Sequence, residues 1–211
     1  MQARRSELAD LHIGTDNNGE GVNLGGQNSA VKDNIIAFNT SDGVQVRSNA
    51  TGVGHDIGPT SIFSNDGLGI DIVDNANNSL GPNGDGPNTN DGGTANDADT
   101  GPNGLQNFPT ITFATTSSRT GQTKIDVFLD TAPSTQYTIR YYSNPRDTGE
   151  GKIFIGQLEN VTTNTNGTSS INDFIALKTV PVGQSITATA TDPAGNTSEF
   201  TGEPRSVRSA P

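Results

Sequence analysis

The octapeptide NDGLGIDI (residues 65–72) has two earlier counterparts in this chain, NTSDGVQV (residues 39–46) and NNGEGVNL (residues 17–24). Each begins with Asn, reaches a Gly after three further residues, and ends with an aliphatic, a polar and an aliphatic residue. The three glycines that precede the aliphatic residues are 22 and 26 residues apart. One unit of this length cannot bury its own apolar side chains, so repetition at this period predicts the stacked coils of a β-solenoid.

The last three residues of each repeat predict how the coils stack. Successive side chains of a strand point to opposite faces, so the aliphatic residues should form an interior ladder with about 4.8 Å between coils. The polar residues between them, Asn23, Gln45 and Asp71, should then face solvent. We expect the glycine of each repeat to adopt backbone angles that other residues cannot. The Asn that opens each repeat is expected to precede a tight turn and to hydrogen-bond to its counterpart in the next coil.

The composition favours many short strands. Of the 211 residues, 29% are hydrophobic and 5% are aromatic, which is low for a helical globule, whereas 26 Gly and 11 Pro supply turns. Disorder is the alternative for such a composition. It stays open for residues 75–107, which contain almost no apolar side chains.

The charge and the lack of cysteine narrow the range of partners. The formal net charge is −11, which repels nucleic-acid phosphates and anionic lipids, so neither is an expected partner. No apolar run approaches the ~20 residues that span a bilayer, so no membrane insertion is expected. With no Cys, the chain has neither a disulfide nor a thiolate metal site.

Changes of pattern along the chain divide it into five segments. Residues 1–11 are expected to be a tail or a short helical cap, residues 12–75 about three coils, and residues 76–107 an acidic connector rich in Gly, Asn and Asp. Residues 108–202 are expected to form an antiparallel β-sandwich, because short strands recur there about every ten residues. Residues 203–211 are expected to be a tail. The expected strands of the sandwich are residues 110–114, 124–129, 137–142, 152–158, 169–176, 185–191 and 198–201.

Three strings, in this order, resemble a family of bacterial surface proteins: NDGLGID (residues 65–71), DADTGPNGLQNFP (residues 97–109) and TATATDPAGNTSEF (residues 187–200). Members of that family carry right-handed parallel β-helix repeats followed by a β-sandwich module, in long secreted or cell-wall-associated chains. The resemblance implies an all-β fold, with a short right-handed parallel β-helix followed by an antiparallel β-sandwich. It also implies an extracellular or cell-surface location. Because the chain has few coils and no export signal, it looks like the C-terminal end of a longer array or a small free-standing relative.

Calcium is the cofactor that the connector suggests. Asp97, Asp99 and Asn103 space oxygen atoms as loops that bind hard cations do, and Asp91 could add another carboxylate. The spacing is not that of an EF-hand, because the Gly at the sixth position and the terminal Glu are missing. The alternative is a loop that Asx-turns and water hold without an ion.

No catalytic motif is present, so we expect a non-catalytic structural or adhesive module, extracellular or on a bacterial surface. Its solenoid ends are expected to support self-association, with filaments as one result.

Two alternatives stay open. The first is a carbohydrate-binding module, for which the candidate exposed aromatics are Tyr137, Tyr141 and Tyr142. The second is the C-terminal part of a polysaccharide hydrolase or lyase, for which Asp71 is the candidate carboxylate. His55 is expected to lie on the surface.

Overall fold

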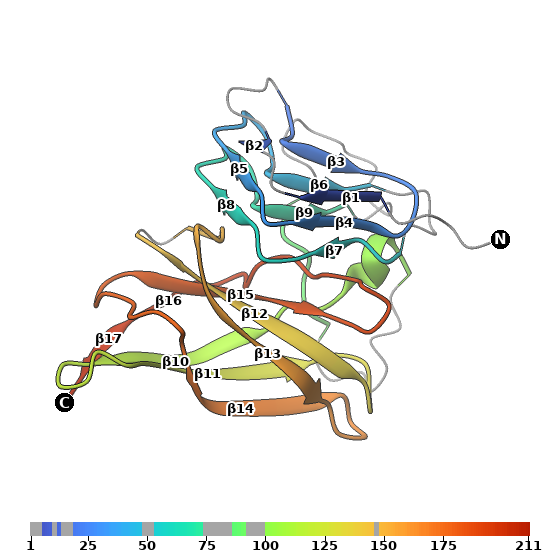
Figure 1. Ribbon diagram of the computed structural model, residues 1–211. Coiled ribbons are helices and arrows are strands. Elements are labelled where there is room, and N and C mark those ends of the chain that lie inside the picture. Colours follow the sequence, from blue (N-terminus) through green and yellow to red (C-terminus); the bar gives the residue numbers. More distant parts are fainter. Residues whose placement is uncertain are drawn as a thin grey trace.

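The computed structural model describes residues 6–9, 12–13, 19–47, 53–73, 86–91, 100–145 and 148–211. In these residues the protein is all-β, as the sequence predicts, with one short 3-10 turn, η1 (Pro102–Leu105). Figure 1 shows two parts, the N-terminal region (residues 6–73) and the C-terminal region (residues 108–211). No helix among the described residues is long and apolar enough to cross a membrane.

The nine described strands of the N-terminal region form three parallel sheets of three strands each. The first sheet contains β1 (Ser6–Ala9), β4 (Ser29–Lys32) and β7 (Asp56–Ile57); the second contains β2 (His12–Ile13), β5 (Ile35–Ala37) and β8 (Ser61–Phe63); the third contains β3 (Val22–Leu24), β6 (Val44–Val46) and β9 (Ile70–Ile72). The chain therefore passes through the three sheets in the same order three times, and each passage adds one strand to each sheet (Figure 1).

The repeated phrases align in the third sheet in the register that the sequence predicts. The two aligned rows are Val22, Val44 and Ile70, and Leu24, Val46 and Ile72. All six side chains are buried in one apolar core, which Tyr142 and Phe200 of the C-terminal region complete. Burial of each such side chain contributes about 1.5–3 kcal/mol relative to exposure. The aliphatic ladder therefore supplies much of the stability of the N-terminal region.

Two of the three polar residues in these strands are not on the surface. Asn23 is exposed as predicted, but Gln45 and Asp71 are completely buried. Gln45 Nε2 donates hydrogen bonds to Asp42 Oδ2 and to Asp71 Oδ2, each at 3.0 Å. The prediction was wrong for these two residues because amide and carboxylate groups stacked in a row satisfy one another and can be covered. Burial raises the pKa of Asp42, and the hydrogen bond from the Leu68 N–H opposes this rise.

Each repeat requires glycine because no room exists there for a side chain, and not because the backbone angle excludes other residues. None of Gly21, Gly43 and Gly69 has a positive φ, contrary to the prediction. A Cβ atom at Gly43 would lie 2.6 Å from Ile62 Cγ2 and 2.7 Å from the Gly69 carbonyl oxygen. Successive strands can approach this closely only because no side chain is present at this position.

The chain begins its strands earlier than the sequence predicts. Residues 6–9, expected to belong to a tail or helical cap, form β1 and pair in parallel with β4, with Ser6 opposite Ser29. The edge of β4 presents main-chain donors and acceptors in a row, which an extended segment can pair with one after another. This pairing outweighs the weak helical preference of so short a segment.

The C-terminal region consists of two four-stranded sheets around one core. One sheet has the order β14 (Thr168–Ile175), β11 (Thr123–Asp130), β10 (Thr110–Ser117) and β17 (Arg208–Ala210); the other has the order β13 (Ile153–Thr162), β12 (Gln136–Asn144), β15 (Ser185–Thr191) and β16 (Arg205–Ser206). All pairings are antiparallel except that of β10 with β17. Side chains from both sheets meet in the core, among them Ile125, Leu129, Ile139 and Ile186.

Two expectations for the end of the chain need correction. Residues 203–211 are not a tail, since β16 and β17 extend both sheets and bury Val207 between them. Residues 198–201 are not a strand of either sheet. They lie instead against the N-terminal region, where Phe200 is only 5% exposed. They nevertheless run alongside β15. The hydroxyl oxygens of Ser198 and Thr201 accept hydrogen bonds from N–H groups of that strand.

We expect a Gly43→Ala variant to lose about 1–3 kcal/mol of unfolding free energy, because the added methyl group must force two strands apart. Urea unfolding followed by circular dichroism measures this loss. Gly19→Ala is the matched control, because a Cβ atom there meets nothing within 4 Å. Equal stability of the two variants would contradict the packing role of Gly43.

Candidate functional site: the junction between the two regions

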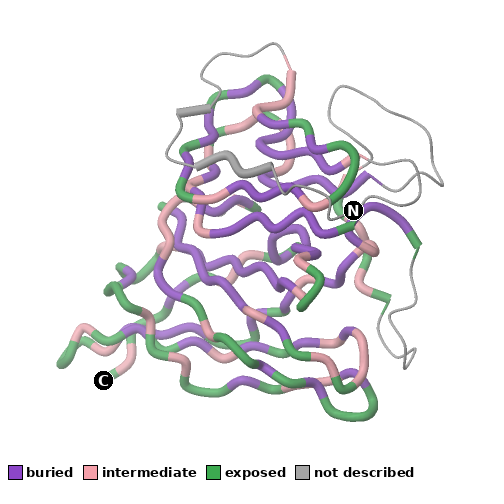
Figure 2. The backbone as a smooth tube through the Cα atoms, turned by 45° about the vertical axis from the view of Figure 1, so that its right-hand side comes forward, coloured by how far each residue is buried: buried purple, intermediate pink, exposed green. Residues whose placement is uncertain are grey.

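The last strand of each parallel sheet lies on the side of the sheet that faces the C-terminal region (Figure 1), and the backbone is mostly buried where the two regions meet (Figure 2). At β8, the Ile62 N–H donates to Gly151 O and the Gly151 N–H donates back to Ile62 O, both at 2.9 Å. At β9, the Ile72 N–H donates to Glu199 Oε1 at 3.0 Å, and Asn88 Nδ2 donates to Ile72 O at 2.7 Å. Both edges thus end in hydrogen bonds to the connector and the C-terminal region.

The edge of β7 ends in the same way. The His55 N–H donates to Asn103 Oδ1 at 3.0 Å, and Asn103 Nδ2 donates to His55 O and to Thr197 O, both at 2.9 Å. The Ile57 N–H donates to Thr197 Oγ1 at 2.9 Å. The outer edges of β7, β8 and β9 are therefore all closed by residues from later in the chain. Such closure matters because an unpaired strand edge recruits other chains.

A carboxylate from the C-terminal region also ends the row of stacked Asn side chains. Asn39 Nδ2 donates to Asn65 Oδ1 at 2.7 Å, which confirms the predicted Asn stacking for these two repeats. Asn65 Nδ2 then donates to Glu150 Oε1 at 2.9 Å. Glu150 also accepts the N–H groups of Ser64 and Asn65, at 2.7 and 3.0 Å. A carboxylate has only acceptors, so it suits the end of a row that presents only N–H groups.

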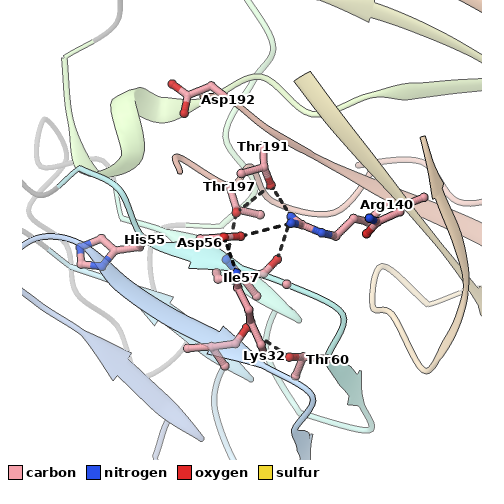
Figure 3. A network of polar contacts seen from close by, with 12 residues as sticks. Lys32, His55, Asp56, Ile57, Thr60, Arg140, Thr191, Asp192 and Thr197 are labelled. Atoms are coloured by element: carbon pink, nitrogen blue, oxygen red, sulfur yellow. Dashed lines mark hydrogen bonds and ion pairs between the residues drawn. The ribbon is translucent and has the colours of Figure 1, made fainter. Parts of the chain in front are cut away.

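A polar network holds the two regions together beside β7 (Figure 3). Asp56 lies between Lys32 of the N-terminal region and Arg140 of the C-terminal region, with Nζ–Oδ2 and Nη2–Oδ1 distances of 2.9 and 3.4 Å. Arg140 Nη1 donates to Thr191 Oγ1 at 2.6 Å, and the Thr191 and Thr197 hydroxyl oxygens are 2.9 Å apart. Asp56 and Arg140 are each 8% exposed. Removal of one member of a buried ion pair costs about 3–5 kcal/mol, so this network fixes the position of the C-terminal region.

A polar cleft of about 490 Å³ opens next to this network, with Asn28 and Gly54 on one side and Thr138 and residues 192–195 on the other. The acidic group at its mouth is already engaged. Asp192 accepts hydrogen bonds from the N–H and the Nδ2 atom of Asn196, at 2.8 and 2.7 Å. These bonds shape the turn that carries Asn196, whose Oδ1 accepts the Gly54 N–H at 2.7 Å. The cleft is thus built from residues that hold the junction.

His55 is buried at the junction and not on the surface as predicted. Neither ring nitrogen has a hydrogen-bond partner in the described part of the chain. Burial lowers the pKa of His55 below its ordinary value of 6.5, against a smaller opposing effect of the Gly26 backbone. The main-chain bonds of His55 to Asn103 explain why sequence patterning misses its burial, since β7 is covered by a residue 48 positions later in the chain.

Of the four predicted calcium ligands, the structure describes Asp91 and Asn103, and each of these bonds to other residues of the chain. Asp97 and Asp99 lie outside the described residues. Asn103 is completely buried and its amide bridges β7 and residue 197, whereas Asp91 Oδ1 accepts a hydrogen bond from Asn107 Nδ2 at 3.1 Å. Within the described residues no group of three or more His, Asp or Glu side chains could hold a metal ion. Calcium binding stays a prediction.

The candidate residues of the two alternative functions are buried. Tyr137, Tyr141 and Tyr142 are 2%, 0% and 2% exposed, so none of them is a surface platform for a sugar ring. Strand β12 lies in the middle of its sheet and is covered on both faces: Tyr137 and Tyr141 belong to the core of the C-terminal region, and Tyr142 belongs to that of the N-terminal region. Asp71 is 0% exposed and therefore does not face solvent.

Sequence reasoning also missed the residues that close the junction. Glu150, Arg140 and Asp56 stand in segments with no recognisable motif, so no local signal identifies them. Thr197 and Glu199 belong to the string TATATDPAGNTSEF, which supports the resemblance to bacterial surface proteins. These two residues of the string contact β7 and β9.

Comparison of the chain with models of known protein families and with curated proteins finds no match. The geometry of the junction therefore carries the functional argument.

We expect the unfolding free energy to fall with decreasing pH below about 6.5, the ordinary pKa of His. The unfolded chain takes up a proton at His55 there, whereas the folded protein does not, because burial lowers the pKa of His55 in the fold. The loss ends once the pH passes below the folded pKa. Urea unfolding between pH 5 and pH 7.5 measures it, with His55→Phe as the variant that cannot titrate. The same pH dependence in that variant and in the unaltered protein would contradict this assignment.

Proposed function

We propose that the N-terminal region is a short right-handed parallel β-helix of three coils, and that the C-terminal region is a β-sandwich that caps its last coil. Three passages through three parallel sheets support the first part. Two sheets around one core support the second. Both parts agree with the resemblance to bacterial surface proteins that carry such repeats.

The protein acts as a non-catalytic structural or adhesive module, outside a bacterial cell or on its surface. The closure of all three strand edges of the last coil carries this proposal. The carboxylates and amides at the junction end the stack of strands. Glu150 and Glu199 accept hydrogen bonds from main-chain N–H groups, and Asn103 bridges two main-chain segments. The burial of Asp71 argues against the polysaccharide-cleaving alternative, because a catalytic carboxylate must reach its substrate.

The opposite end of the β-helix is where the module associates. Strand β3 is the outer strand of its sheet and, within the described residues, pairs with β6 alone. The Val22 N–H donates toward β6, to Gly43 O at 2.9 Å, so by alternation the Asn23 N–H points away from β6. A strand from a second copy, or from a preceding coil in a longer chain, can add at this edge. Because the last coil is capped, two copies meet first coil to first coil, which gives a closed dimer and not a filament.

We expect this chain to dimerise and an Asn23→Pro variant to stay monomeric, because proline removes the N–H that points to the added strand. Size-exclusion chromatography with multi-angle light scattering measures the mass across a concentration series. Asn23→Ala keeps the N–H and should dimerise as the unaltered protein does. Thermal unfolding of all three proteins checks that the proline variant is folded. A dimer that persists in a folded Asn23→Pro variant would place the interface elsewhere, and a monomer at every concentration would contradict self-association.

A further inference from the structure

One aromatic side chain stands where both its backbone and its exposure are unfavourable. Phe38 follows β5 with a φ of 60°, a left-handed conformation that a bulky L-residue rarely adopts. Its side chain is also 51% exposed. Ser64 stands at the same corner in the next coil, with a φ of 57°, so the corner itself requires this backbone. The corner therefore requires the backbone conformation but does not require Phe, since Ser adopts the same conformation in the next coil.

A second cleft lies at the junction between the two regions, next to Phe63, which the Phe38 ring contacts. It has a volume of about 460 Å³, which is within the range of ligand-binding pockets. Phe63, Ser64 and Asn65 line it on one side, and residues of the hairpin between β12 and β13, among them Thr148 and Lys152, line it on the other. The ring of Phe38 packs edge-on against that of Phe63, with the centroids 5.6 Å apart. The exposed ring thus extends the aromatic wall of the cleft to the surface.

The cleft presents hydrogen-bonding groups that the protein itself does not use. Lys152 Nζ lies 4.3 Å from the centroid of the Phe63 ring, and it has no ion pair among the described residues. The hydroxyl groups of Ser64 and Thr148 likewise have no hydrogen bond to the described part of the chain. Glu150 differs, because its oxygens are taken up by Ser64 and Asn65. The free groups are therefore one ammonium group and two hydroxyl groups beside an aromatic surface.

We propose that Phe38 and this cleft bind a neutral hexose-containing glycan. The apolar C–H face of one sugar ring stacks on Phe38, and hydroxyl groups of the adjoining sugar bond to Lys152, Ser64 and Thr148. A sugar ring fits such a site, because it has a flat apolar C–H face together with several hydroxyl groups that form hydrogen bonds. The net charge of −11 favours a neutral glycan over a polyanionic one, despite the single ammonium group. The inference does not rest on the dimer proposed above, because Phe38 and the cleft belong to one copy.

The full chain is tested on an array that carries cellohexaose, mannohexaose, N-acetylchitohexaose and hexagalacturonate. We expect retention on at least one neutral oligosaccharide. Calorimetric titration with that oligosaccharide then compares two variants. Phe38→Asn should weaken binding at least tenfold while its melting temperature stays equal or rises, because Asn tolerates the left-handed backbone. Phe113→Ala is the matched control, since Phe113 is a similarly exposed phenylalanine, at 43%, on the outer face of the C-terminal region.

Three results would overturn the proposal. The first is an array with no retention, or with retention on hexagalacturonate alone. The second is binding to a neutral oligosaccharide that Phe38→Asn leaves unchanged, or that Phe113→Ala weakens equally. The third is a melting temperature that falls by several degrees in Phe38→Asn with unaltered affinity, since this would assign Phe38 to packing. A Lys152→Met variant, which keeps the side-chain length and removes the ammonium group, should also weaken binding; unchanged affinity there would contradict the role of the cleft.

Discussion

Main-chain hydrogen bonding at the edge of a parallel stack is the constraint on which this structure depends. Strands as short as β7, β8 and β9 contribute few apolar contacts each, and their outer N–H and C=O groups would be left without partners if the stack ended in an apolar surface. The C-terminal region and the connector supply those partners through Thr197, Gly151, Glu199, Asn88 and Asn103. The position of the C-terminal region against the last strands and the burial of Glu199 and Asn103 follow from this requirement.

The chemistry of the closing residues explains why so many polar groups are buried in a protein with few apolar ones. A carboxylate only accepts hydrogen bonds, so Glu150 and Glu199 fit rows of N–H groups, whereas the amide of Asn103 both donates and accepts and can bridge two main chains. A buried polar group destabilises the fold when it has no hydrogen-bond partner, and it costs little free energy when all its hydrogen bonds are made. The carboxylate of Asp56 is likewise compensated where it is buried, because it lies between the cationic groups of Lys32 and Arg140.

How far the sequence predicts the structure depends on whether the deciding contact is local. The ladder of Val22, Val44 and Ile70 follows from repetition and strand alternation, and the register confirms it. The burial of Gln45 and Asp71 does not follow, because alternation assumes water on the outer face. The roles of His55 and Glu150 depend on partners 48 and 86 positions away, respectively, and no pattern within a repeat indicates them. The exposed position of Phe38 was equally hidden, since its left-handed backbone is set by the corner and not by its neighbours in sequence.

Native-state hydrogen exchange, followed residue by residue by NMR, tests the central claim that the C-terminal region closes the last strands of the three parallel sheets. The informative amides are those of Ile57, Ile62 and Ile72, which donate to Thr197, Gly151 and Glu199. The account predicts that these three amides are protected as strongly as those of the central strand β12. Exchange of all three at the rate of exposed loop amides, with β12 still protected, would show that the edges are open in solution and would contradict the account.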